Sequence, residues 1–330
     1  MLAYIARRLM YMVVTFFALS VVVFIIIQLP PGDYLSSYIQ RLQAEGTVVA
    51  EEQIAALREY YGLDKGPVEQ YLKWITRLVQ GDLGTSFQWN KPVAQLLRER
   101  VPYSAMLAIL TIVVIYSVAV PVGIYLATHQ YSFGDYAISL VALAGMATPN
   151  FMLALILMYI LFRVFGMSVG GLFSPDYAMA PWSWGKVLDL ARHMLLPILI
   201  IGFGSTGGLI RTMRAVLLDE LKKQYVVTAR AKGVPERTLL FRYPVRIALN
   251  PIASTIGWRL PQIVSGETVI SIVLSLPTTG PLLYQALISQ DMFMAGSIVM
   301  VLSVLTVIGT LISDILLVLI DPRISFEGRK

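Results

Sequence analysis

Six long apolar stretches constrain this chain more than any other feature of its sequence. An α-helix of about twenty residues crosses the ~30 Å of hydrocarbon in a bilayer, and each stretch is near or above that length. They are, in chain order, Leu9–Leu29, Val101–Thr128, Tyr136–Phe162, His193–Ile210, Ile247–Ser275 and Met292–Ile320. The sequence therefore predicts an all-α membrane protein with six transmembrane helices.

The composition supports a membrane environment, because 57% of the residues are hydrophobic and only 14% are charged. The net charge of +6 could indicate a nucleic-acid partner, but the Lys and Arg residues gather between the apolar stretches. Cytoplasmic loops of membrane proteins carry such an excess, so we interpret it as a signal of orientation and expect no nucleic acid. Cysteine is absent, which excludes disulfides and thiolate metal sites.

The distribution of charge predicts which segments lie on each side of the membrane. Arg7 and Arg8 precede the first stretch, which is too long for a signal-peptide core and should remain as a helix. Residues 33–100 have a soluble composition and are predicted to form a small extracytoplasmic lobe. Residues 166–192 should also be external, whereas residues 211–246, with nine basic and three acidic residues, should be cytoplasmic. Six spans then place both termini in the cytoplasm.

Several predicted spans are interrupted, which is unusual for a simple membrane anchor. Pro121 and Pro149 lie inside the second and third spans, and the fourth contains Gly202, Gly204, Gly207 and Gly208. Broken helices usually line a cavity, and glycines allow a neighbouring helix to approach closely. With no tandem repeat or linker, residues 1–330 are predicted to form a single membrane domain.

The basic cytoplasmic segment has the local pattern of a helix, a tight turn and a second helix. Gly233 suits the left-handed residue just past a helix end, and Pro235 suits the first turn of a new helix. Ala229 and Ala231 leave little bulk before the turn. This helix–turn–helix, which we call the elbow, could dock into a cleft on a soluble partner. On composition alone, an ordered basic loop held near anionic lipid is the alternative.

The elbow sequence VTARAKG, Val227 to Gly233, is followed by Asn250 and Pro251 and resembles the EAA loop of binding-protein-dependent ABC importer permeases of the dipeptide and oligopeptide family. Val227 and Thr228 stand where the broader consensus has Glu and Ala. Five further blocks resemble this family in the same order: RRLMYMVV to PPGD, YGLDKGPVEQYLKWITRLVQGDLGTSF, RHMLLPILIIGFGSTGGLIRTMRAVLLDEL, GETVISIVLSLPTTGPLLYQAL and DPRI.

The resemblance implies the type I ABC importer permease fold of the first permease, which has the large external loop. It also implies that the elbow is the coupling helix that docks on an ABC ATPase subunit. The coupling residues carried over are Val227, Thr228, Ala229, Arg230, Ala231, Lys232, Gly233, Pro235 and Glu236.

The resemblance also implies the partners of the chain. They are a homologous second permease, two ABC ATPase subunits, an extracytoplasmic solute-binding protein and membrane lipid. The complex is expected at the cytoplasmic (inner) membrane of a bacterium or archaeon. The chain contains no G-x-x-x-x-G-K-[ST] phosphate loop, so ATP and magnesium should be bound by the ATPases. We expect no cofactor on this chain and no enzymatic activity of its own.

The expected activity is ATP-driven import of di- or oligopeptides by alternating access. The same machinery could carry oligosaccharides, opines, glutathione or a metal chelate. A secondary transporter is a rival of another class, because broken helices and intramembrane charges also suit ion coupling, although no inverted repeat is visible. A membrane scaffold that moves nothing is the second rival.

Arg259 and Glu267 are ionisable groups inside the fifth predicted span. Such residues usually face a cavity or a partner, so both are candidates for the translocation path, where they could pair with peptide termini. Alternatively, Glu267 lies near the external interface and Arg259 makes a buried pair or reaches the interface. His129 and His193 lie at span ends, far apart and without metal-ligand spacing, so we expect no metal site.

Overall fold

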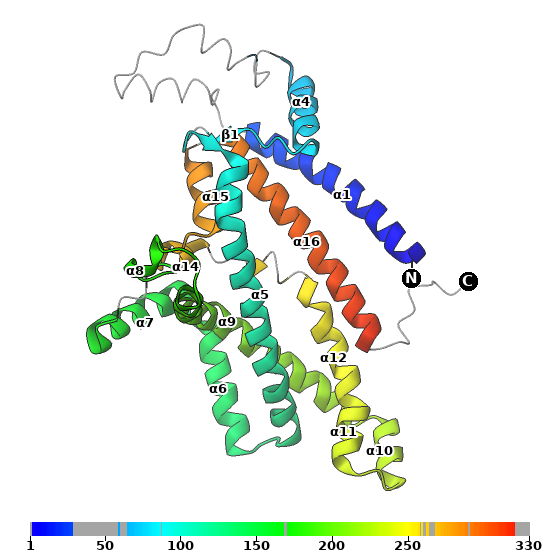
Figure 1. The fold of residues 1–330 in the computed structure, drawn as a ribbon. Coiled ribbons are helices and arrows are strands. Elements are labelled where there is room, and N and C mark those ends of the chain that lie inside the picture. Colours follow the sequence, from blue (N-terminus) through cyan, green and yellow to red (C-terminus); the bar gives the residue numbers. More distant parts are fainter. Residues whose placement is uncertain are drawn as a thin grey trace. The chain divides into compact units, whose positions relative to one another are not determined.

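The computed structural model describes residues 2–28, 59, 65–86, 88–167, 170–257, 259, 262–263, 268–289 and 291–320 (Figure 1). Helices dominate these residues. The described strands are β1, Thr85–Ser86, and β2, Lys91–Pro92, which pair antiparallel in a short hairpin. The all-α prediction is therefore confirmed at the level of fold class. Glu267 and most of residues 33–64 lie outside the described residues.

The chain divides into two compact units, which are described separately. Unit 1 contains Met1–Pro102 and Pro281–Val304, and unit 2 contains Tyr103–Gly280 and Leu305–Lys330. That residues 1–330 form a single membrane domain therefore stays a prediction. The described helices are α1 (Leu2–Gln28), α4 (Pro67–Val79), α5 (Val93–Thr128), α6 (Phe133–Ala147), α7 (Asn150–Phe165), α8 (Pro175–Ala178), α9 (Trp184–Leu221), α10 (Gln224–Ala231), α11 (Glu236–Arg242), α12 (Pro244–Ser254), α14 (Thr268–Val273), α15 (Thr279–Ile288) and α16 (Met292–Ile320).

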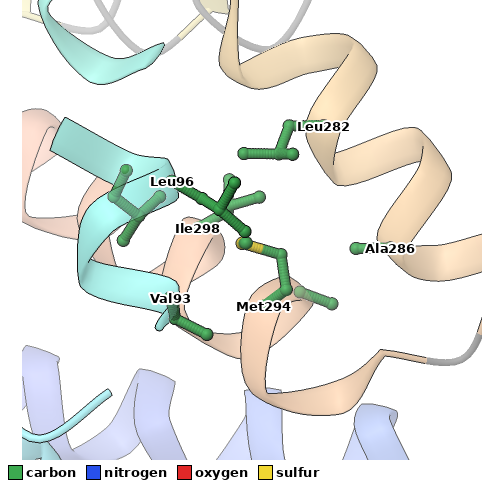
Figure 2. Close-up of a cluster of buried hydrophobic side chains, with 8 residues drawn as sticks. Val93, Leu96, Leu282, Ala286, Met294 and Ile298 are labelled. Carbon is green, nitrogen blue, oxygen red and sulfur yellow. The ribbon is translucent and has the colours of Figure 1, made fainter. Parts of the chain in front are cut away.

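Unit 1 contains a buried apolar cluster contributed by the first turns of α5, by α15 and by the start of α16 (Figure 2). The cluster consists of Val93, Leu96, Leu97, Leu282, Ala286, Met294, Ala295 and Ile298. The buried carboxylate of Asp291 accepts hydrogen bonds from the hydroxyl of Ser86 and from the backbone N–H of Met294, the latter at 3.2 Å. Asp291 thereby fastens the β-hairpin to the start of α16. Elsewhere in unit 1, the hydroxyls of Ser20 on α1 and Tyr71 on α4 lie 2.8 Å apart.

Three described helices are long and apolar enough to cross a membrane: Val93–Thr128, Trp184–Leu221 and Phe293–Leu317. A fourth candidate is the pair α6 and α7, bent by 103°. The predicted third span is thus divided at Thr148–Pro149, because Pro149 has no backbone N–H to continue the α6 hydrogen-bond ladder. The predicted fifth span is also in pieces, with α12 at its start and α14 near its end.

Helices α6 and α9 of unit 2 approach closely because glycine lines their contact. A Cβ added to Gly207 would lie 2.6 Å from the carbonyl oxygen of Ala142. One added to Gly204 would lie 3.0 Å from the carbonyl oxygen of Gly145. The expectation that glycines in the fourth stretch allow close helix packing is confirmed at these two positions. It is wrong at Gly202 and Gly208, where an added Cβ would make only ordinary contacts of 3.5 and 4.0 Å with side chains.

Segments of unit 2 that were predicted to share a side of the membrane meet in the structure. At the predicted external ends, the backbone N–H of Thr279 donates to the hydroxyl of Ser104 at the start of the second predicted span, at 2.8 Å. The N–H of Gly171 donates to the carbonyl of Leu274, near the end of the fifth predicted span, at 2.8 Å. Among the predicted cytoplasmic ones, Arg214 near the end of α9 pairs with Asp135 at the start of α6. These contacts agree with the predicted order of inward and outward segments.

Candidate coupling elbow

The elbow begins two residues after the end of α9 and consists of α10, the turn around Gly233 and α11. In Figure 1, α10 and α11 lie beside each other next to α12, in agreement with their packing contacts. Val226 on α10 and Leu239 on α11 are completely buried and anchor the elbow to the rest of unit 2. Burial of these two side chains contributes about 2 kcal/mol each.

A hydrogen bond ties the first turn of α10 to the last turn of α9. The hydroxyl of Tyr225 donates to Oε2 of Glu220 at 2.6 Å. Burial, together with this bond to the carboxylate, raises the pKa of the Tyr225 hydroxyl, so Tyr225 stays protonated and remains a donor. The start of α10 is therefore held to the end of α9 by a side-chain hydrogen bond as well as by the chain.

The turn has the backbone conformation that the sequence predicts. Gly233 has φ +77°, the left-handed region that glycine adopts without steric cost, and a Cβ added to it would meet open space. Its N–H donates to the carbonyl of Arg230 at 3.0 Å, and the N–H of Val234 donates to that of Ala229 at 3.3 Å. Pro235 was expected within the first turn of the second helix, but it is the N-cap residue just before α11. Its carbonyl accepts the first helical hydrogen bond, from Leu239.

An ion pair closes the turn from outside. Nε and Nη2 of Arg230, in the last turn of α10, donate to the two carboxylate oxygens of Glu236, in the first turn of α11; the Nη2–Oε2 distance is 3.1 Å. The guanidinium of Arg230 lowers the pKa of Glu236, and the carboxylate raises that of Arg230. An acid at a helix start and a base at a helix end also complement the two helix dipoles.

The remaining predicted coupling residues lie mostly on the open side of the elbow. Val227 is 47% exposed, while Ala229 is half-buried against the rest of unit 2. The other exposed members of the set are Thr228, Ala231, Lys232, Gly233 and Pro235. Phe241 on α11 is 54% exposed and is not among the coupling residues predicted from the sequence. A large apolar residue in a basic, polar segment could have indicated a contact surface, because an exposed phenylalanine is unfavourable in water.

Of the two translocation-path candidates, only Arg259 is among the described residues. The hydroxyl of Tyr116 on α5 lies 2.6 Å from Oγ1 of Thr255, at the end of α12. The guanidinium of Arg259 interacts electrostatically with the same tyrosine hydroxyl. Arg259 is half-buried. The structure therefore places Arg259 in a polar cluster with Tyr116 and Thr255 in unit 2.

The two histidines have separate local surroundings. His129 stacks on the ring of Tyr125 at a centroid distance of 4.5 Å, and Nδ1 of His193 lies 3.5 Å from a carboxylate oxygen of Asp189. Across the part of the chain that the structure describes, no three His, Cys, Asp or Glu side chains are grouped as metal ligands would be.

Comparison with known proteins identifies the family of this chain. Residues 119–326 match the family described as "Binding-protein-dependent transport system inner membrane component", and residues 1–108 match the N-terminal region of such membrane components. The chain belongs to this family. It is therefore the permease of a binding-protein-dependent ABC transporter, an inner-membrane transport component without a nucleotide-binding domain, and not a secondary transporter.

Individual relatives align along the whole chain. The oligopeptide transport system permease protein AppB of Bacillus subtilis is 30% identical over 328 residues, which cover 99% of this chain and 100% of the relative. The inner membrane ABC transporter permease protein YejB of Escherichia coli O157:H7 is 30% identical, with 99% and 100% covered. The peptidoglycan transport system permease protein YejB of Agrobacterium fabrum is 28% identical, with 99% of each covered.

Proposed function

We propose that this chain imports di- or oligopeptides across the cytoplasmic membrane by alternating access. Relatives named for oligopeptide and peptidoglycan transport support a solute built with peptide bonds. Oligosaccharides, opines, glutathione or a metal chelate are the alternative solutes of the same machinery. The complex contains this permease, a homologous second permease, two ABC ATPases that bind ATP and magnesium, and an extracytoplasmic solute-binding protein.

In this proposal, the elbow docks on an ATPase subunit. The observation that carries it is the exposed helix–turn–helix at Gly233, whose coupling residues other than Ala229 are exposed while Val226 and Leu239 are buried. Six spans place both termini and residues 211–246 in the cytoplasm and residues 33–100 outside. The four span candidates among the described residues and the grouping of unit 2 contacts at two ends support this topology.

Arg259 and Glu267 belong to the translocation path in this proposal. A cation inside the fifth predicted span is costly against lipid, so a polar cluster with Tyr116 and Thr255 supports a position on a water-filled path. There the guanidinium would meet the carboxylate end of a peptide, and Glu267 the amino end.

Reconstitution of the complete transporter in liposomes tests the proposal. Uptake of labelled di- and tetrapeptides should require ATP inside the liposome and the binding protein outside. A panel of oligosaccharides, glutathione and nickel chelates serves as the comparison. Uptake of one of these without peptide uptake would refute the peptide assignment, and ATPases that do not copurify with the permease would refute the docking assignment.

A further inference from the structure

A buried ion pair joins α6 to the helix that ends at the elbow. Nε and Nη2 of Arg214 donate to the two carboxylate oxygens of Asp135, at 2.8 and 2.7 Å. The Asp135 side chain is only 4% exposed, whereas that of Arg214 is 28% exposed. A two-point contact between a guanidinium and a carboxylate fixes relative orientation as well as distance.

The carboxylate of Asp135 also organises the turn that precedes α6. It accepts a hydrogen bond from the backbone N–H of Tyr131 at 3.0 Å. The backbone N–H of Asp135 donates to the hydroxyl of Ser132, the N-cap of α6. Tyr131 has φ +65°, which a residue with a bulky side chain adopts only when its surroundings hold it there. Arg214 therefore binds a carboxylate whose position is also fixed by the turn at Tyr131.

Arg214 lies seven residues before the end of α9, or about 10 Å along the helix axis. The elbow follows after two residues and is tied to Glu220 through Tyr225. Before Arg214 on α9, the Gly207–Ala142 and Gly204–Gly145 contacts bring the backbones of the two helices close together. Three sets of contacts thus connect these helices: Tyr225–Glu220 between the elbow and α9, and both Arg214–Asp135 and the glycine contacts between α9 and α6.

This connected body ends at Thr148–Pro149, where the chain turns by 103° into α7. We propose that Asp135 and Arg214 are positioning residues for transport: their pair holds α6 to α9, so that a displacement of the elbow is delivered to the α6–α7 bend. The proposal rests on docking of the elbow to an ATPase, and it adds the route by which that docking reaches a broken span.

The test compares Arg214→Gln and Asp135→Asn with Arg211→Gln in the complete reconstituted transporter. Arg211 lies on α9 one turn earlier and is exposed, which makes it a matched control. We expect both pair variants to retain ATP hydrolysis while peptide uptake falls about tenfold, and the control to remain within about twofold of the unaltered protein. The reciprocal variant Asp135→Arg with Arg214→Asp should recover part of the loss. A purely structural role would lower hydrolysis and uptake together.

Distances measured by electron spin resonance provide a second readout, because the chain contains no cysteine that would compete for spin labels. Labels at Leu140→Cys on α6 and Ala215→Cys on α9, both exposed, should keep one narrow distance with and without ATP. In Arg214→Gln the distribution should broaden. An ATP-dependent change of several ångströms in the unaltered background would overturn the proposal, as would uptake by Arg214→Gln equal to that of Arg211→Gln.

The two proposals fail in different ways. Loss of ATPase copurification with the unaltered permease would refute the docking assignment. An ATPase that binds and supports uptake regardless of the Asp135–Arg214 pair would leave docking intact and refute the positioning role.

Discussion

Arg230 and Glu236 face each other across the left-handed residue Gly233, where Nε and Nη2 of Arg230 donate to the two carboxylate oxygens of Glu236. Six positions separate them in sequence, so no regular helix would bring them together. The turn creates the pair, and the pair in turn stabilises the angle between α10 and α11. The elbow thus has a defined shape before any partner is bound.

The conformation of Gly233 should be sensitive to any side chain. Gly233→Ala should lower the stability of the elbow by about 1 kcal/mol, because an L-residue is strained at φ +77° even though its Cβ meets open space. Transport should fall with it. Gly208→Ala is the control, since Gly208 also has room for a Cβ but lies inside α9 with an ordinary helical φ. Thermal unfolding and peptide uptake measure both variants, and equal behaviour of the two would contradict the role of backbone strain.

The titration of Glu236 should depend on Arg230. The folded-state pKa of Glu236 is lowered, so the ion pair contributes fully to folded-state stability above the ordinary carboxyl pKa. This contribution is lost as the pH falls through the lowered pKa. In Arg230→Gln, the midpoint of Glu236 should rise toward the ordinary range, which NMR of ¹³C-labelled glutamate side chains can follow. Lys232→Gln, an exposed cation two residues away, should leave the midpoint unchanged.

The exposed apolar residues of the elbow should contribute to ATPase binding. Phe241→Ser or Val227→Ser should weaken the affinity of the permease for the ATPase about tenfold, because each removes an apolar side chain from the proposed interface. Met179→Ser alters a residue that is 98% exposed on the predicted external side and should have no effect. Binding is measured with detergent-solubilised subunits, and an equal effect of all three variants would place the interface elsewhere.

The contact between α6 and α9 should distinguish two adjacent glycines. Gly207→Ala places a Cβ 2.6 Å from a backbone carbonyl and should destabilise the protein by about 1–3 kcal/mol. At Gly208 the nearest atom would be 4.0 Å away, so Gly208→Ala should be tolerated. Thermal unfolding of the two variants in the same detergent provides the comparison. Similar midpoints would mean that α6 and α9 separate more easily than their packing indicates.

Removal of the Arg259 charge should slow transport without affecting assembly. Arg259→Ala should reduce the uptake of peptides with a free carboxylate, whereas copurification with the ATPases should not change. Tyr116→Phe removes the hydroxyl between Thr255 and Arg259 and should have a smaller effect. Peptides with an amidated carboxyl end serve as the comparison substrate. Unchanged uptake by Arg259→Ala would assign Arg259 a structural role.

Local patterns in the sequence determined the helical class, the elbow and the left-handed Gly233, because each depends on apolar run length or on the conformational range of one residue. The tertiary structure decided which distant residues meet. Asp135 and Arg214 are 79 positions apart, and no local pattern assigns one to the other. The proline at position 149 marked an interruption, but only the packing of α6 and α7 against α9 sets the 103° bend. Helix formation is governed by interactions within a few residues, whereas pairing and crossing angles depend on how whole helices pack.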